Sequence, residues 1–249
     1  MTAALETRSL CKNFGALEVA QCIDFTLEAG ARHALIGPNG AGKTTLVNML
    51  MGGLSPSSGS ILLEGVDVTR KSQRERVKRG LGRTFQINTL FRDLTVLDNV
   101  SLAVAERHGV AWSMLRPASG YRAVLEESMQ VLESLGLARD AKNRLRSMPY
   151  GKQRLVEIAI ALGMRPKVLL LDEPAAGIPS METHRILEVL DSLPSEIAIL
   201  IIEHDMDLVF RFARRITVLA QGTVLMEGTP GEVSSDERVR QVYLGERHA

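Results

Sequence analysis

Short runs of apolar residues, bounded by turn residues or charges, recur along the chain. Two of them, residues 167–173 and 197–204, contain consecutive Leu, Ile and Val without polar alternation, which is typical of parallel strands buried on both faces. Between them, the apolar residues of 181–193 recur at helical spacing. A strand, a helix and a second strand in this order predict a right-handed crossover in an α/β architecture. Further short strands are predicted at 33–37, 80–85 and 215–220.

Two other patterns accompany this core. Residues 94–165 contain helical periodicity and no convincing strand, so we expect a helical lobe inserted between core strands. Its helices are predicted at 95–109, 121–137 and 151–164. The first part of the chain instead predicts an antiparallel layer, with short strands at 8–14, 22–30 and 59–69, and residues 222–228 are typical of one arm of a hairpin.

Composition and charge narrow the function classes. The 249 residues include 30 Lys and Arg and 29 Asp and Glu, a net charge of +1, so no whole-surface field attracts DNA or anionic lipid. Cys11 and Cys22 lie outside any CxxC pair, which favours reduced thiols over a zinc site or a disulfide scaffold. Residues 1–14 do not resemble a signal peptide, and no apolar run approaches the roughly 18 residues that span a bilayer. If the protein works at a membrane, we expect another chain to span the bilayer.

The stretch GPNGAGKTTL, residues 37–46, forms the first candidate site. Its spacing matches the phosphate-loop pattern G-x-x-x-x-G-K-[ST]. Such a loop turns backbone N–H groups toward a polyphosphate, and glycine takes the positive φ angles that this requires at little cost. A strand before the loop and a helix beginning near Lys43 are expected. The predicted nucleotide-contacting residues are Gly37, Pro38, Asn39, Gly40, Ala41, Gly42, Lys43, Thr44 and Thr45.

A second candidate site follows the buried strand 167–173. The strand ends in Asp172 and Glu173, and ligands of open α/β sheets bind at the carboxyl ends of the strands. Beside a phosphate loop, Asp172 and the Thr44 hydroxyl are expected to hold Mg²⁺, and Lys43 to reach the β and γ phosphate oxygens. Glu173 is expected to orient and deprotonate the attacking water.

With these two motifs in place, the chain resembles the ATP-binding subunits of ABC transporters over nearly its full length. The resemblance implies an α/β fold in which a P-loop NTPase (RecA-like) core carries an antiparallel β subdomain and an inserted helical subdomain. The whole chain, residues 1–249, is expected to be one ABC-type ATP-binding domain, with the helical subdomain at about residues 88–165.

The same resemblance assigns three further residues. Gln86, in GRTFQ, matches the glutamine that senses Mg²⁺ and water and contacts the membrane subunit. His204, in IIEHD, matches the switch histidine that bonds the γ-phosphate. Phe14 precedes the phosphate loop by the distance at which the family stacks an aromatic ring on adenine. Gln86 and His204 thus join Glu173 as expected catalytic residues, and Gln86 also joins the expected metal contacts.

The stretch SMPYGKQR lies where the family has its signature motif. In the family, two subunits pair head to tail, and each signature loop presents helix-start amides to the γ-phosphate held by the other. Tyr150 and Gly151 occupy the matching positions and are expected to contact nucleotide, but Pro149 replaces the usual serine. Proline offers neither a hydroxyl nor an N–H, which predicts slower turnover. Lys152 is expected to restore some positive charge, and Pro179, after the second motif, is a further departure.

Details such as EHDMDLVF and GTVLMEGTPGEV look most like the ATPase subunits of branched-chain amino-acid importers and their relatives for other small polar solutes. The resemblance implies ATP and Mg²⁺ as cofactors and a peripheral place on the cytoplasmic face of the membrane. The implied partners are permease subunits, a second ATPase subunit, either self or paralogue, and indirectly a solute-binding protein. The transported solute stays open because other chains recognise it.

Three alternatives remain open. The basic residues between 70 and 83 suggest a nucleotide switch acting on nucleic acid, but stacking aromatics and a high pI are missing. We therefore expect a solvated helix face, or a contact with lipid headgroups or a membrane subunit, and no nucleic-acid partner. A metabolic kinase would use Glu173 on a substrate hydroxyl but would leave the signature-like stretch and His204 without a role. Pro149 leaves a weakly hydrolytic regulatory ATPase as the third alternative.

Overall fold

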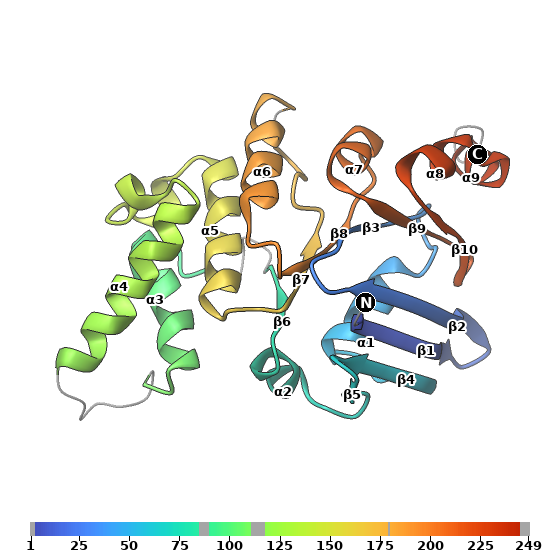
Figure 1. The fold of residues 1–249 in the computed structure, drawn as a ribbon, viewed down its shortest axis with the longest axis horizontal. Helices are drawn as coiled ribbons and strands as arrows, with labels where there is room; N and C mark the ends of the chain where they lie inside the picture. The colour runs from blue at the N-terminus through green and yellow to red at the C-terminus, as the bar shows by residue number, and fades with distance from the viewer. Residues whose placement is uncertain (1–2, 85–89, 111–117, 179, 245–249) are drawn as a thin grey trace. The chain divides into compact units, whose positions relative to one another are not determined.

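The structure, a computed structural model, describes residues 3–84, 90–110, 118–178 and 180–244. The chain folds as two compact units (Figure 1). The sheet unit comprises Met1–Leu81, Lys167–Glu173 and Leu193–Ala249. The helical unit comprises Gly82–Pro166 and Pro174–Ser192.

A six-stranded sheet with the order β10-β9-β3-β8-β7-β6 contains the predicted core strands. Strands β7, β8, β3 and β9 are parallel neighbours, and β10 runs antiparallel to β9 as the predicted hairpin arm. Every residue of β8 is buried, and so is every residue of β7 except Asp172 at its end, which confirms the prediction that these two strands are covered on both faces. The strands are β3 (Arg32–Ile36), β6 (Leu81–Arg83), β7 (Val168–Asp172), β8 (Ala198–Ile202), β9 (Arg215–Ala220) and β10 (Thr223–Gly228).

A second, antiparallel sheet has the order β2-β1-β4-β5 and confirms the predicted antiparallel layer. Its strands are β1 (Ala3–Phe14), β2 (Leu17–Glu28), β4 (Ser58–Leu63) and β5 (Val66–Asp67). β1 and β2 extend beyond the predicted ranges because register shifts interrupt their pairing and blur the alternation that marks a strand. The apolar side chains of helix α1 (Lys43–Met51), among them Leu46 and Leu50, pack into a core cluster. The cluster also contains residues of both sheets, such as Phe25 and Leu200.

The described part of the sheet unit also contains four short helices, of which the first falls in the basic run that was expected to form a solvated helix face and the other three were not predicted. They are α2 (Gln73–Lys78), α7 (Met206–Phe212), α8 (Pro230–Ser235) and α9 (Glu237–Leu244). Capping boxes begin α2, with Ser72 and Glu75, and α8, with Thr229 and Glu232, so each start satisfies two backbone amides reciprocally. Helices of six to eight residues carry too few apolar positions for periodicity to detect.

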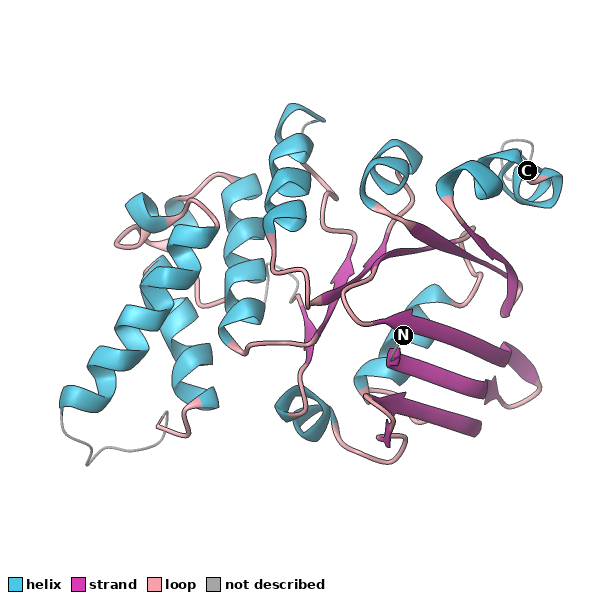
Figure 2. Ribbon diagram, in the orientation of Figure 1, coloured by secondary structure: helices cyan, strands magenta, loops and turns pink. Residues whose placement is uncertain are grey.

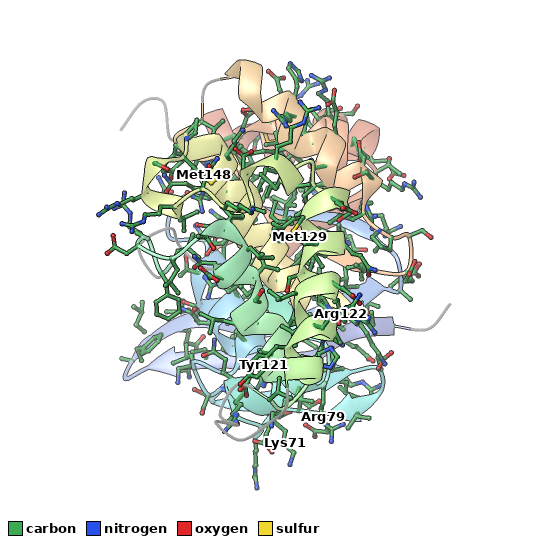
Figure 3. The ribbon with its side chains drawn as sticks, turned by 90° about the vertical axis from the view of Figure 1, so that its left-hand side faces the viewer. Lys71, Arg79, Tyr121, Arg122, Met129 and Met148 are labelled. Atoms are coloured by element: carbon green, nitrogen blue, oxygen red, sulfur yellow. The ribbon has the colours of Figure 1, made fainter. Side chains whose placement is uncertain are left out.

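The helical unit contains α3 (Val96–Arg107), α4 (Ala118–Ser134), α5 (Tyr150–Gly163) and α6 (Ser180–Ser192), drawn in cyan in Figure 2. The described residues between 94 and 165 contain helices and 3₁₀ turns and only one isolated bridge, Thr95 to Arg144, as predicted. Glu127 of α4 forms ion pairs with Arg107 at the end of α3 and with Arg165 after α5. The outer side of α4 carries Tyr121, Arg122 and Met129 (Figure 3).

The unit boundary differs from the expected helical insertion at about 88–165. It begins at Gly82 and also includes α6, the crossover helix that the sequence placed with the core strands. The reason is that α6 packs against α5, so its apolar face belongs to the helical unit. No helix within the described ranges is both long and apolar enough to cross a bilayer.

Candidate nucleotide site

The glycine loop between β3 and α1 requires glycine where its backbone turns. Gly42 has a φ of 100°, and a Cβ atom there would lie 2.7 Å from the carbonyl oxygen of Val19. Gly40 has a φ of 76° with open space around it. The loop is tied to the end of the sheet because the Gly222 amide donates to the Ala41 carbonyl at 3.1 Å. The strand, the loop and the helix that begins at Lys43 therefore match the predicted phosphate-loop arrangement.

The amino end of α1 has the electrostatics of an anion site. Gly42 is its N-cap, no side chain caps it, and no acidic residue lies in its first turn. Its backbone amides and the positive end of its helix dipole therefore face the loop. The Lys43 Nζ atom lies within the loop and donates to the carbonyls of Gly37 at 2.5 Å and Pro38 at 2.9 Å. A lysine ammonium and bare amides at one turn suit a phosphate group.

A cavity of about 1120 Å³ opens over this loop. All nine predicted loop residues line it, from Gly37 to Thr45, together with Glu173 and His204. The structure thus brings the first candidate site, Glu173 of the second and the predicted switch histidine to one cavity of the sheet unit. The sequence analysis missed eight lining residues, Val19, Met206, Phe210, Val233, Ser234, Val239, Arg240 and Tyr243. Most belong to the short helices α7, α8 and α9, whose weak periodicity gave no signal.

Glu173 and His204 form a pair at the carboxyl ends of β7 and β8. The His204 Nδ1 atom lies 3.6 Å from Glu173 Oε1, and both side chains are more than half exposed. The Glu173 amide donates to the Ile202 carbonyl at 2.9 Å, which fixes the turn after β7 to the end of β8. An exposed carboxylate beside an imidazole can accept a proton from water while the ring bonds a neighbouring anionic oxygen.

Glu203 supports His204 and was missed by the sequence analysis. The residue is 2 % exposed, and its Oε2 atom accepts the His204 amide at 3.2 Å. The same carboxylate lies 3.8 Å from His204 Nδ1. The signal available in the sequence was an acidic residue directly after a five-residue apolar strand. A carboxylate that is buried at such a position needs a hydrogen-bonding or charged partner.

Two other predicted ligands of the sheet unit, Asp172 and Phe14, do not line the cavity. Asp172 ends β7 and is half-buried, but unlike Thr44 it does not line the cavity. Phe14 lies at the end of β1, is half exposed, has the Lys12 ammonium 5.0 Å from its ring centre, and is also absent from the lining. Its role as the adenine-stacking ring stays a prediction. Gln86 lies outside the described residues.

The signature-like stretch of the helical unit forms the start of α5. Pro149 is the N-cap, with φ −54° and ψ 149°, rather than a residue of the first turn, and it gives no side-chain cap. Its carbonyl accepts the Gln153 amide at 3.1 Å, which begins the helix. Gly151 is buried, whereas Tyr150 is 42 % exposed, with the Arg154 guanidinium 5.6 Å from its ring centre. The helix start is thus intact despite the proline.

The expectation that Lys152 restores positive charge at the signature-like stretch is wrong. Its Nζ atom lies 2.7 Å from Asp140 Oδ2, so the lysine charge is neutralised within the helical unit. Farther along α5, the buried Glu157 pairs with Arg154 at 2.9 Å, and burial raises the pKa of Glu157 to about 7. Pro179 lies outside the described residues.

The comparisons with known proteins agree with this arrangement. Residues 20–176 match the family model of the ABC transporter, and residues 223–249 match that of the branched-chain amino acid ATP-binding cassette transporter. The chain is similar to the high-affinity branched-chain amino acid transport ATP-binding protein LivG of Escherichia coli K12, with 37 % identity over 97 % of this chain and 98 % of that protein. It is 36 % identical to BraF of Pseudomonas aeruginosa over the same shares.

A solved structure is similar as well. The ADP conformation of MJ1267, an ATP-binding cassette of an ABC transporter, superposes with a TM-score of 0.84 and 29 % identity, covering 98 % of this chain and 100 % of that one. A fold built around a glycine loop, a strand-end acid pair and a signature-like helix start thus coincides with a family match over most of the chain. The chain belongs to the ABC transporter family of ATP-binding proteins.

Proposed function

We propose that this chain is the ATP-hydrolysing subunit of an ABC importer that takes up branched-chain amino acids, or a related small polar solute, through a separate membrane permease. The observation that carries the proposal is the common cavity of the glycine loop, Lys43, Glu173 and His204. The names of LivG and BraF support the solute class. The work of the chain is then to bind ATP, hydrolyse it and pass the resulting change of shape to the permease.

The roles within the sheet unit follow from chemistry. The loop amides, the α1 amino end and Lys43 bind the triphosphate. The Thr44 hydroxyl and the Asp172 carboxylate would hold Mg²⁺, because oxygen donors suit this ion and one carboxylate plus substrate phosphates is its usual protein environment. Mg²⁺ would neutralise charge on the phosphate oxygens. Glu173 takes a proton from the attacking water, and His204, supported by Glu203, bonds the γ-phosphate.

The helical unit supplies a second half-site in this proposal. The α5 start, with Gly151 and Tyr150, would face the γ-phosphate held by a second copy or a paralogue. Gln86 would link the nucleotide to the permease and contribute to the Mg²⁺ environment. The permease, and through it a solute-binding protein, places the chain at the cytoplasmic face of the membrane. An uncharged helix start whose first residues, Pro149 and Tyr150, are exposed fits an anion brought by another molecule.

Phosphate release and transport test the proposal together. The purified chain is expected to release phosphate from Mg-ATP without any acceptor molecule. In vesicles with the permease and the solute-binding protein that co-purify with the chain, ATP is expected to drive uptake of radiolabelled leucine, isoleucine or valine. A Lys43→Ala variant is the control that should lose both activities. Uptake that fails for these amino acids but succeeds for another small polar solute would correct the cargo alone.

Two alternatives predict other outcomes. A metabolic kinase transfers the γ-phosphoryl group to a hydroxyl acceptor, so it forms ADP only with that acceptor present and releases no inorganic phosphate, and a nucleic-acid switch binds duplex DNA with an affinity that falls steeply with salt. Either result, together with no effect on uptake, would contradict the proposed function. A phosphate-release rate that stays low even with the permease present would favour the regulatory ATPase suggested by Pro149.

A further inference from the structure

The two cysteines of the chain lie side by side in the antiparallel sheet. The Sγ atoms of Cys11 in β1 and Cys22 in β2 are 3.5 Å apart. They are the only cysteines in the sequence. Cys22 is exposed and Cys11 is half-buried, so a small molecule in solution can reach the pair. From the sequence, reduced thiols were expected because the two cysteines lie outside any CxxC pair.

The backbone at this point brings the thiols together. The β1–β2 register shifts between the pairs Leu10–Ile23 and Lys12–Ala20, which inserts an extra residue into β2 opposite Cys11. Cys22 accordingly has a φ of 48°, a conformation that costs a non-glycine residue energy. An irregularity of this kind re-aims a side chain, and here it turns the Cys22 thiol toward Cys11.

The two thiols are chemically unequal. The Cys11 sulfur accepts the Cys22 amide at 3.3 Å. Hydrogen bonds from the Ser58 hydroxyl and from this amide lower the pKa of the Cys11 thiol, whereas the neighbouring Cys11 sulfur raises the pKa of the Cys22 thiol. Thiolate is the attacking form in disulfide exchange. Cys11 is therefore the better nucleophile, and Cys22 lies within reach as the thiol that completes the exchange.

We propose that Cys11 and Cys22 form a reversible dithiol–disulfide site that reacts with small-molecule disulfides of the glutathione class. The Cys11 thiolate attacks one sulfur of the disulfide, forming a mixed disulfide and releasing one thiolate. Cys22 loses its proton and attacks the Cys11 sulfur, forming the Cys11–Cys22 bond and releasing the second thiolate. Two protein thiols are oxidised and one small disulfide is reduced to two thiols. The sulfur atoms need to approach from 3.5 Å to about 2 Å.

The site is placed to affect the strand beside the glycine loop. Only two residues separate Cys22 from Val19, whose carbonyl oxygen lies against Gly42 and which lines the cavity. The proposal itself does not depend on the proposed function, because it concerns only the chemistry of two thiols that lie next to each other.

Intact mass measurement with oxidised glutathione tests the site. The native chain is expected to lose the mass of two hydrogen atoms, to lose both titratable thiols together, and to recover them with dithiothreitol. Cys22→Ser is expected to accumulate one stable glutathione adduct on Cys11. Cys11→Ser is expected to react at least tenfold more slowly, because the faster nucleophile is gone.

Several results would overturn the proposal. A native chain that keeps two free thiols, or that carries glutathione adducts without closing a bond, would show that the sulfurs do not meet. Equal reaction rates for the two serine variants would contradict the assignment of Cys11 as nucleophile. Peptide mapping of the oxidised native chain decides whether the bond joins Cys11 to Cys22 or joins two molecules, and the latter result would also reject the site.

Discussion

At the scale of single residues, nucleotide binding and ATP turnover are expected to depend on single side-chain atoms at two positions, Gly42 and Pro149. Gly42 has no room for a Cβ atom because of the Val19 carbonyl, whereas Gly40 has open space. Pro149 occupies the N-cap of α5, where a hydroxyl side chain would accept a backbone amide. Two predictions follow from these positions.

Gly42→Ala is expected to weaken nucleotide binding by at least tenfold and to lower the thermal midpoint. The added methyl group meets a backbone oxygen, and alanine resists the φ of 100°. Gly40→Ala is the matched control, because its only cost is the positive φ of alanine, which destabilises the folded loop by about 1 kcal/mol. Titration with a fluorescent ATP analogue measures both. Equal binding by the two variants would show that the Val19 contact does not shape the loop.

Pro149→Ser is expected to raise ATP turnover severalfold. The serine hydroxyl can accept an α5 amide, worth about 1 kcal/mol of stability, and can also donate to the γ-phosphate of a second copy. Pro149→Ala is the control, since it restores the backbone N–H but not the hydroxyl. Steady-state phosphate release and thermal unfolding measure the effects. A serine rate no higher than that of the alanine variant, or lower than that of the native chain, would reject the argument.

At the scale of elements, the stability of α1 depends on a contact with α2 that was not predictable from the sequence. The basic residues from Arg70 to Arg83 were expected to be solvated or to contact a membrane partner, and Lys71 and Arg79 do project outward near α2 (Figure 3). Arg76 is an exception to that expectation, with only 1 % exposure. Its guanidinium donates to the carbonyls of Met49 and Leu50 at 2.6 Å, at the carboxyl end of α1, and to the carbonyls of Thr69 and Lys71.

Arg76→Met is expected to destabilise the chain by about 3 kcal/mol, because it leaves buried carbonyls at the end of α1 without donors. Lys78→Met, two residues away on the exposed side of α2, is the matched control and is expected to change stability by less than about 0.5 kcal/mol. Denaturant unfolding followed by circular dichroism measures both free energies of unfolding. A similar small effect for both variants would mean that Arg76 does not stabilise α1.

The sequence predicted those elements whose patterns are strong. Buried strands such as β8 and long helices such as α5 have clear periodicity, and the glycine loop has a motif whose geometry leaves little choice. The short helices α7 to α9 and the exposed halves of β1 and β2 lack such patterns. Contacts between distant residues were not predictable either: neither the Lys152–Asp140 pair nor the meeting of Cys11 with Cys22 leaves a trace in local sequence.

At the scale of the whole molecule, the chain divides into a unit that contains the glycine loop and a unit that carries the signature-like helix start. Protonation of the buried Glu157, which lies in the second unit, makes the stability of the chain depend on pH. Burial raises its pKa to about 7 from the ordinary 4.5, so the folded state holds the proton more tightly than the unfolded state does. As pH rises from 4.5 to 7, the unfolded carboxyl ionises first, and this residue's contribution to stability falls.

Glu157→Gln is expected to remove that dependence. The free energy of unfolding of the variant minus that of the native chain should rise between pH 4.5 and 7 and level off above. Burial lowers the pKa of His33 to about 4, which makes stability rise with pH from about 4 to 6.5. His33 is present in both proteins, so its effect cancels in the difference. A difference that stays flat or falls across this window would contradict the assignment.

The central claim is that a triphosphate held in the glycine loop of one copy is closed over by the α5 start of another. The most direct measurement is the molecular mass of Glu173→Gln by light scattering with Mg-ATP and with Mg-ADP, because this variant binds ATP but should not hydrolyse it. We predict a dimer with ATP and a monomer with ADP, and a monomer in both when Lys43→Ala is added. Equal dimerisation with both nucleotides, or a monomer with ATP bound at saturation, would contradict the account.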